Sequence, residues 1–372
     1  MQRRMRILVA VVVLVAVAPT IAGELVRLTE GTEDWRKPSV DLRGRNVLYG
    51  NSGALFLHDA KKGGVTIITH RDAGDARISG NGKVVVYSSD GDPLGTNVDG
   101  NEEIFVYDVK GSITTQITAT ADCESGSVST DKKGRRIAFL SDGDLRGDNP
   151  DRNVEIFMMD TGDGTVTQIT NTLAGTNNNR PEIVATGKYV YFSSDADPLS
   201  TNPEGNREIF RYVVKTDTIE QLTVTTSGNC TDPSVSKNGK YVVFESASDE
   251  LAGPNLDGGR EIYRLRVKKG EIIRVTDSDV DSSNASVSGN GRIITYEGRG
   301  DPVGANLDGS REIFQTWLKR GVWQTTQITS GESPYRSRRA VLSSNGKRTF
   351  FESDADLTGE GAGNDHIFQY IR

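Results

Sequence analysis

A loop rich in aspartate, asparagine and glutamate recurs along the chain, and its oxygen-bearing side chains keep nearly the same spacing in each copy. In the first copy they are Asp92, Asn97, Asp99, Asn101 and Glu103. Carboxylate and amide oxygens at alternate positions suit Ca²⁺, which takes six to eight oxygen ligands. Side chains of the same kind also build turns by bonding nearby backbone N–H groups. The candidates in later copies are Asp144, Asp151, Glu155, Asp197, Glu208, Asp301, Asp308 and Glu312.

The loops therefore predict either a structural brace repeated along the fold or a series of calcium sites. Calcium is the only cofactor that the sequence suggests, and we expect that none is required.

A basic and aromatic group of residues forms a second candidate site, provided that the two ends of the chain meet. Guanidinium groups pair with carboxylates through parallel hydrogen bonds. The group therefore predicts an anionic ligand, such as a uronic sugar or a carboxylate-bearing peptide. The alternative is a solvated rim that balances an acidic protein. The members of the group are Trp35, Arg36, Lys37, Tyr335, Arg336, Arg338 and Arg339.

These candidates lie in a sequence unit that recurs about every 50 residues, a period typical of propellers and repeat arrays. An aromatic residue marks each unit at a spacing of 51 to 54 residues, from Phe105 and Phe157 to Phe368. Each unit has four β-rich segments, of which the second, such as KYVVFE at 240–245, suits a strand buried on both faces. Asn238-Gly239 before it predicts a tight hairpin. The pattern predicts an all-β fold of four-stranded antiparallel blades.

The ends of the chain indicate how such a fold closes. Seven outer segments end in an aliphatic residue and threonine, from Leu28-Thr29 to Ile328-Thr329. The first of them precedes any inner strand, and the last unit stops after its third strand. We therefore expect the N-terminal strand to complete the last blade and to close a seven-bladed β-propeller, which leaves only short, protected sheet edges. A single propeller domain would cover residues 24–372.

Segments such as TTQIT at 114–118 and KYVYFSSDADPLSTNPEGNREIFRY at 188–212 resemble the TolB-type, WD-like propeller repeat of bacterial envelope and secreted proteins. The resemblance covers the whole mature chain and implies the fold much more than a function. TolB itself has an N-terminal α/β domain and six blades, whereas this chain has no room for that domain and counts to seven. The same repeat occurs in peptidase propellers and in pectin-oligomer lyases, and the lyase resemblance implies a histidine-rich metal site.

Enzymatic chemistry has little support in the residues. The chain has no GxSxG motif, and its three histidines, His58, His70 and His366, are scattered. We therefore expect a non-catalytic scaffold that binds an envelope or extracellular protein or a glycan as a monomer. The alternative is a polysaccharide lyase or hydrolase that uses acids near the central channel, because acidic residues are plentiful.

Residues 1–22 have the pattern of a secretory signal peptide, with Arg3, Arg4 and Arg6 before an apolar run at 7–18. That run is short for a membrane anchor, which needs about 20 residues. We therefore expect cleavage before Gly23, a periplasmic or secreted protein, and no membrane insertion of the mature chain. The net charge of −7 also argues against nucleic acid as a partner.

Overall fold

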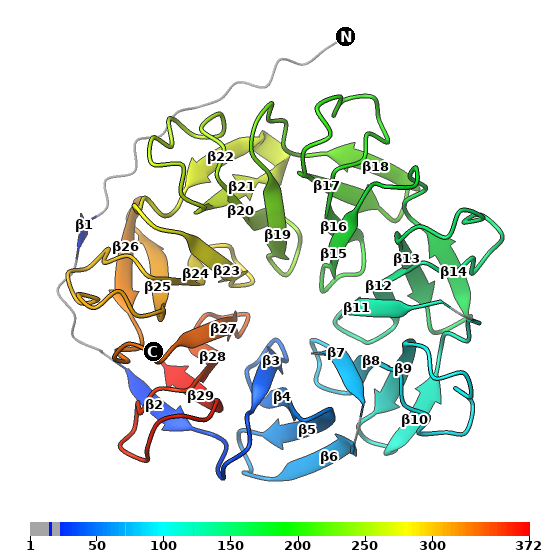
Figure 1. Ribbon diagram of the computed structural model, residues 1–372, viewed down its shortest axis with the longest axis horizontal. Helices are drawn as coiled ribbons and strands as arrows, with labels where there is room; N and C mark the ends of the chain where they lie inside the picture. The colour runs from blue at the N-terminus through cyan, green and yellow to red at the C-terminus, as the bar shows by residue number, and fades with distance from the viewer. Residues whose placement is uncertain (1–14, 17–22, 71, 122) are drawn as a thin grey trace. The chain divides into compact units, whose positions relative to one another are not determined.

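The computed structural model describes residues 15–16, 23–70, 72–121 and 123–372, so the signal peptide predicted at 1–22 lies outside the described residues except for 15–16. Within these ranges, no helix has the length and apolar character needed to cross a membrane. Their regular structure is all β apart from the 3-10 turn η1 (Val267–Lys269). Seven sheets, each built on four antiparallel strands of the repeat, form a seven-bladed β-propeller, as predicted (Figure 1).

The chain divides into two compact units, 36–221 and 222–372 together with the N-terminal segment up to residue 35. We call them the four-blade unit and the three-blade unit. In the four-blade unit, blade 1 contains β3 (Arg36–Val40), β4 (Asn46–Asn51), β5 (Ala54–Asp59) and β6 (Val65–Thr69), and blade 2 contains β7 (Ala73–Ile78), β8 (Val84–Ser89), β9 (Glu103–Asp108) and β10 (Ile113–Gln116). Blade 3 contains β11 (Ser125–Thr130), β12 (Arg136–Ser141), β13 (Glu155–Asp160) and β14 (Thr165–Gln168), and blade 4 contains β15 (Asn178–Ile183), β16 (Tyr189–Ser194), β17 (Glu208–Val213) and β18 (Thr218–Gln221).

The three-blade unit has the same plan. Blade 5 contains β19 (Cys230–Val235), β20 (Tyr241–Ser246), β21 (Glu261–Arg266) and β22 (Glu271–Arg274). Blade 6 contains β23 (Ser282–Val287), β24 (Ile293–Gly298), β25 (Glu312–Lys319) and β26 (Val322–Gln327), with β1 (Val15–Ala16) added in parallel to β26. Blade 7 contains β27 (Ser337–Leu342), β28 (Arg348–Ser353), β29 (His366–Ile371) and β2 (Glu24–Arg27).

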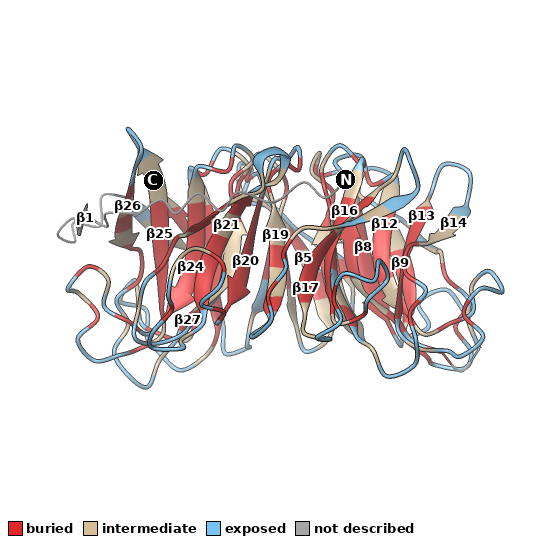
Figure 2. Cartoon of the chain, turned by 90° about the horizontal axis from the view of Figure 1, so that it is seen from above, coloured by how far each residue is buried: buried red, intermediate tan, exposed pale blue. Residues whose placement is uncertain are grey.

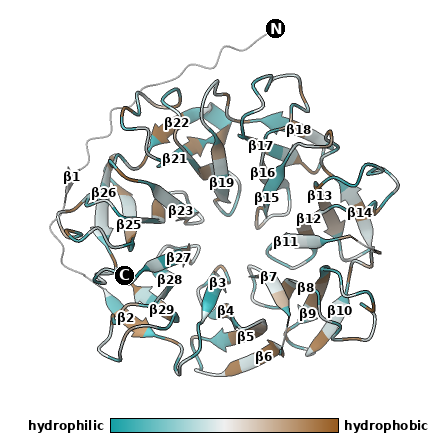
Figure 3. Ribbon diagram, in the orientation of Figure 1, coloured by the Kyte–Doolittle hydropathy of each residue, from teal (hydrophilic) through white to brown (hydrophobic). Residues whose placement is uncertain are grey.

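The aromatic residue that marks each unit lies on the third strand of its blade and packs against an aromatic residue of the second strand. Tyr87 and Phe105, for example, stack with their ring centroids 5.5 Å apart, and both are fully buried. Such pairs add about 0.5–1.5 kcal/mol beyond the area they bury. Figure 2 shows this buried layer along the strands and exposed residues in the loops, and Figure 3 shows hydrophobic segments on β8 and β9.

The N-terminal strand completes the last blade, as the offset of the repeat predicts. β2 pairs antiparallel with β29, with Glu24 opposite Ile371 and Arg27 opposite Phe368. The pairing continues beyond the strand, because Leu28 N donates to Ile367 O at 2.7 Å. The outer edge of blade 7 is therefore covered by the start of the chain.

Candidate active site

The repeated acidic loops are held by their own side chains. Asp92 Oδ1 accepts hydrogen bonds from the backbone N–H of Thr96 at 2.7 Å and of Asn97 at 2.9 Å. Asn97 Nδ2 in turn donates to the backbone oxygens of Asp90, Gly91 and Asn101. Aspartates at the equivalent position make the same contacts in other blades; they are Asp144, Asp197 and Asp301.

In blades 2 to 6, the glutamate at the start of the third strand is a brace. Glu103 is fully buried, and its Oε1 accepts hydrogen bonds from Thr120 N, from Thr120 Oγ1 at 2.7 Å and from Asn101 Nδ2 at 3.2 Å. Glu155 holds Thr172 in the same way, Glu208 accepts from Asn206, and Glu312 accepts from Gly331 N. The bonds from Thr120, Thr172 and Gly331 tie these loops to the segments that follow the outer strands.

Calcium binding by these loops remains a prediction. Asp99 and Asp151 are exposed, and Asp308 accepts hydrogen bonds from Ser310 and from Ser333 N. In blade 7, His366 replaces the brace glutamate, and Arg27 and Thr29 contact its ring. Within residues 23–70, 72–121 and 123–372, no three His, Cys, Asp or Glu side chains are grouped to hold a metal ion.

The predicted basic group is divided between the two units. Trp35, whose Nε1 donates to Glu30 O at 3.2 Å, belongs to the three-blade unit, as do residues 335–339. Arg36 and Lys37 are exposed and belong to the four-blade unit. The contacts of Tyr335, Arg336, Arg338 and Arg339 are therefore considered within their own unit below, and a shared site with Arg36 stays a prediction.

Lys37 belongs to a cluster of charges on the inner strands that sequence reasoning missed. Its Nζ lies 3.2 Å from Oδ1 of Asp75 on β7. Arg77 lies two residues further along β7, and Arg180 and Glu182 occupy β15 of blade 4. In a propeller the innermost strand of each blade faces the central channel. The cluster therefore lies on the inner strands of blades 1, 2 and 4 of the four-blade unit.

The register shows how the cluster is organised around blade 3. Arg77 pairs with Val86, Ser129 with Ala138 and Glu182 with Tyr191, so these three residues are equivalent in their blades. Two residues earlier on each inner strand stand Asp75, Ser127 and Arg180. Along the inner strand, the acidic residue therefore precedes the basic one in blade 2, whereas in blade 4 the basic residue precedes the acidic one. Blade 3 between them offers only serine hydroxyls at these two positions.

The two acids of the cluster differ in proton affinity. Burial opposes ionisation of Asp75, but the charges of Arg77, Lys37 and Arg180 outweigh it and hold the pKa of Asp75 below its usual range. Burial dominates at Glu182 and raises its pKa, although Arg77 and Arg180 oppose the rise. Two carboxyl groups whose pKa values are driven apart can act as a base and an acid at the same pH. The arrangement can therefore move protons in both directions.

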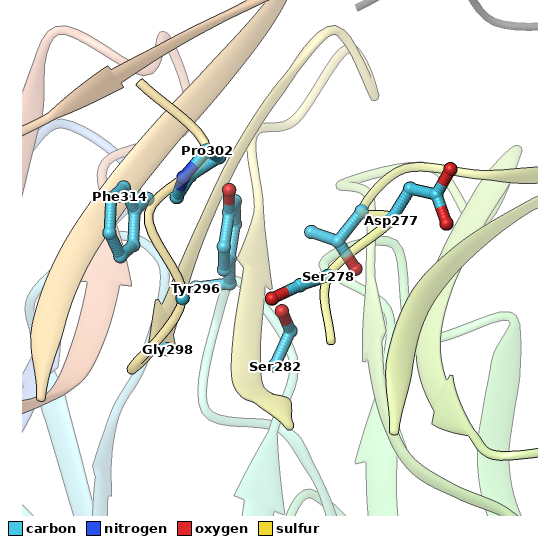
Figure 4. A pocket seen from close by; sticks show the side chains of 9 residues that line it. Asp277, Ser278, Ser282, Tyr296, Gly298, Pro302 and Phe314 are labelled. Atoms are coloured by element: carbon cyan, nitrogen blue, oxygen red, sulfur yellow. The ribbon is translucent and has the colours of Figure 1, made fainter. Parts of the chain in front are cut away.

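A small cavity in the three-blade unit cannot serve as a substrate site. It has a volume of about 10 Å³, close to the smallest that holds one water molecule. Figure 4 shows Ser278, Ser282 and Tyr296 gathered around it. The remaining lining residues are Thr276, Asp277, Gly298, Gly300, Pro302 and Phe314.

Comparison with known proteins finds similarity in structure alone. No family model matches the sequence, and no curated protein matches it significantly. An oligogalacturonate lyase from Vibrio parahaemolyticus is similar with a TM-score of 0.67 at 12% identity over 96% of each chain. An oligogalacturonate lyase in complex with manganese has a TM-score of 0.62 at 14% identity, over 96% of this chain and 95% of that one. A putative TolB from Agrobacterium tumefaciens has a TM-score of 0.48 at 19% identity, over 68% and 83%.

The manganese in one of these lyases raises the question of a similar centre here, and the described residues do not fit one. His58 lies on β5, His70 follows β6, and His366 begins β29, where Arg27 and Thr29 contact its ring. In the part of the chain that the structure describes, none of these histidines belongs to a group of three or more His, Cys, Asp or Glu side chains that could hold a transition metal.

The comparisons contradict our expectation of a non-catalytic scaffold. The similar structures with the higher scores are lyases, which favours the alternative of an enzyme that uses acids near the central channel. Identities of 12% and 14% establish the fold alone. By its fold, the chain is a seven-bladed β-propeller of four-stranded antiparallel blades.

Proposed function

We propose that the protein is an enzyme that cleaves an acidic polysaccharide or oligosaccharide, by β-elimination, at the inner strands of the four-blade unit. The observation that carries the proposal is the pair Asp75 and Glu182, which interact with the same two arginines and whose pKa values are shifted in opposite directions. The fold likeness to oligogalacturonate lyases supports a uronate substrate.

Each member of the cluster has a role in such a reaction. Arg77 and Arg180 would pair with the carboxylate of a uronate unit, which makes the neighbouring C5 proton more acidic because charge develops on that carboxylate. Asp75 would remove the C5 proton, and Lys37 would keep Asp75 ionised through its 3.2 Å contact. As the C4–O bond breaks and a C4=C5 double bond forms, Glu182 would give its proton to the leaving oxygen.

Hydrolysis is the second candidate, because two carboxyl groups of unequal pKa also suit glycoside hydrolysis. The two reactions leave different products. Elimination creates a double bond conjugated with the carboxylate, which absorbs ultraviolet light, whereas hydrolysis creates a new reducing end without that absorbance.

The test is incubation of the full chain with oligogalacturonate of defined length, with both products assayed. We expect ultraviolet-absorbing product from the wild type and at least about 100-fold less from Asp75→Asn and Glu182→Gln. Asp217→Asn serves as a matched control, because Asp217 lies in the hairpin before β18 and bonds Tyr212 instead of an inner strand. Equal activity of all four proteins, or none in the wild type on any acidic glycan, would refute the proposal.

Action outside the cytoplasm is part of the same proposal. It rests on the signal-peptide pattern of residues 1–22. N-terminal sequencing of protein recovered from a bacterial periplasm should begin near Gly23, and an uncut N-terminus in the cytoplasm would refute it.

A further inference from the structure

The three-blade unit contains a set of buried carboxylates that the other four blades do without. Three glutamates occupy the fifth position of the second strand, next to the stacked aromatic residue, and each is at most 1% exposed; they are Glu245, Glu297 and Glu352. The equivalent residues of blades 1 to 4 are Gly50, Ser88, Leu140 and Ser193. The blade fold therefore needs no acid here, and burying one is costly unless it has partners.

The partners of these acids are arginines that reach the surface. Arg311 Nη1 donates to Glu297 Oε2 at 3.2 Å, and Arg339 N donates to Glu297 Oε1 at 3.4 Å. Arg339 Nη1 also donates to Glu352 Oε1 at 3.0 Å. The side chains of Arg311 and Arg339 are 36% and 47% exposed. Glu297 thus contacts the guanidinium of Arg311 and the backbone of Arg339, which belong to adjacent blades.

Arg336 joins them through the backbone. Arg311 and Arg336 form an isolated parallel bridge, and Ser337 N donates to Arg311 O at 2.8 Å. The Arg336 side chain is 49% exposed, and its Nε lies 4.0 Å from Oδ2 of Asp354.

Arg338, which the sequence placed in the same group, has a different role. Its side chain is only 19% exposed, and its Nη2 donates to both carboxylate oxygens of Asp365 at 2.6 Å. It is therefore engaged inside blade 7.

We propose that Arg311, Arg336 and Arg339 form a binding site for an oxyanion group of a ligand: a carboxylate, a sulfate or a phosphate. Each guanidinium has five N–H donors, and the contacts to Glu297 and Glu352 occupy one nitrogen each of Arg311 and Arg339. Holding an arginine in place before binding reduces the entropy lost on binding. Glu297 and Glu352 are the positioning residues. The proposal does not rest on the lyase activity, because it shares no residue with it.

The test is calorimetric titration of the full chain with sodium acetate, sulfate and phosphate at constant ionic strength set with chloride. We expect at least one of the three anions to bind the wild type, and the Arg311→Ala/Arg339→Ala protein to bind it at least about tenfold more weakly. The anion that binds most tightly shows whether the site prefers a planar carboxylate or a tetrahedral sulfate or phosphate group. Arg292→Ala is the matched control, because Arg292 is an exposed arginine of the same blade at the opposite end of β24.

Two further variants keep the proposal falsifiable if the double variant does not fold. Glu297→Gln retains an acceptor for Arg339 N but removes the charge that holds Arg311, so it should weaken anion binding while leaving the anion preference unchanged. Arg77→Ala should retain the anion binding that Arg311 and Arg339 provide, because Arg77 belongs to the proposed active site, and this variant therefore separates the two sites. No anion binding by the wild type, or equal binding by wild type and a folded arginine variant, would overturn the proposal.

Discussion

Ser282 and Gly298 lie opposite each other on β23 and β24, and blade 6 consequently lacks a hydroxyl pair that other blades have. At the same place in blade 3, Ser125 Oγ lies 2.9 Å from Ser141 Oγ, and Ser337 and Ser353 are paired at 2.9 Å in blade 7. The missing side chain leaves part of the small cavity of Figure 4.

We therefore expect Gly298→Ser to stabilise the fold. A Cβ at this position would have Ser282 Oγ as its nearest neighbour, at 3.7 Å, so the new side chain has room. A hydrogen bond contributes about 1 kcal/mol, and a strand glycine is about 0.5–1 kcal/mol less favourable than alanine. The free energy of unfolding in urea should rise by about 1–2 kcal/mol. Gly298→Ala is the control for the hydroxyl group, and a serine variant no more stable than the alanine variant would contradict the explanation.

The brace of blade 5 should make stability depend on pH. Asn101 donates to Glu103 and Asn153 to Glu155, but the equivalent residue before Glu261 is Gly259. Burial raises the pKa of Glu261 to about 7 from 4.5. A raised carboxyl pKa stabilises the fold below the unfolded value, and this contribution is lost as the pH rises through 7.

We expect the wild type to lose up to about 3 kcal/mol of unfolding free energy between pH 4.5 and 7.5 through this group. Gly259→Asn should reduce the loss, because an amide donor favours the ionised carboxylate. Urea unfolding at several pH values measures both proteins. If the unfolding free energies of the wild type and Gly259→Asn change in parallel with pH, the asparagine amide does not control the pKa of Glu261.

The proposed reaction should have a bell-shaped pH profile. Asp75 must be ionised and Glu182 protonated, so activity appears as the pH rises through the lowered pKa of Asp75 and disappears above the raised pKa of Glu182. Glu182→Gln should lower kcat about 10²–10⁴-fold and remove the alkaline limb. An alkaline limb that persists in this variant would assign it to another group.

Removal of residues 23–29 should expose the outer edge of blade 7. The deletion takes away β2, and with it the bonds to β29. We expect a loss of unfolding free energy on the order of several kcal/mol and self-association through the uncovered strand. Size-exclusion chromatography and urea unfolding would measure the two effects, with deletion of residues 1–22 alone as the control. A monomer of unchanged stability would contradict the expected role of β2.

The periodic part of the fold could be predicted from the sequence, and the site could not. Phe105 and its counterparts recur in every unit because each blade needs the same stacked pair, so their spacing gives the number of blades. Asp75 and Glu182 lie on different blades, about a hundred residues apart in the sequence, and their interaction depends on the arrangement of the inner strands. The sequence did contain a signal for this site. The charged segments DAR at 75–77 and RPE at 180–182 differ from other inner strands, which have small, polar residues such as PSVS at 233–236.

Interpretation of the acidic loops from sequence was limited for a different reason. The same Asp and Asn types serve a turn and a metal equally well, and only hydrogen-bond partners such as Thr96 N and Thr120 Oγ1 show which backbone groups the loop side chains hold. The basic group was incomplete because Arg311, which touches Glu297 together with Arg339, lies in the preceding blade.

The pairing of β2 with β29 also has a consequence for the order of events during synthesis. A ribosome makes β2 before β3 to β28 and makes β29 after them. A nascent chain can therefore assemble its intermediate blades early, yet blade 7 has to wait for β29. A prematurely terminated polypeptide would carry an unmatched β2, which proteases and chaperones could recognise as the mark of an unfinished molecule.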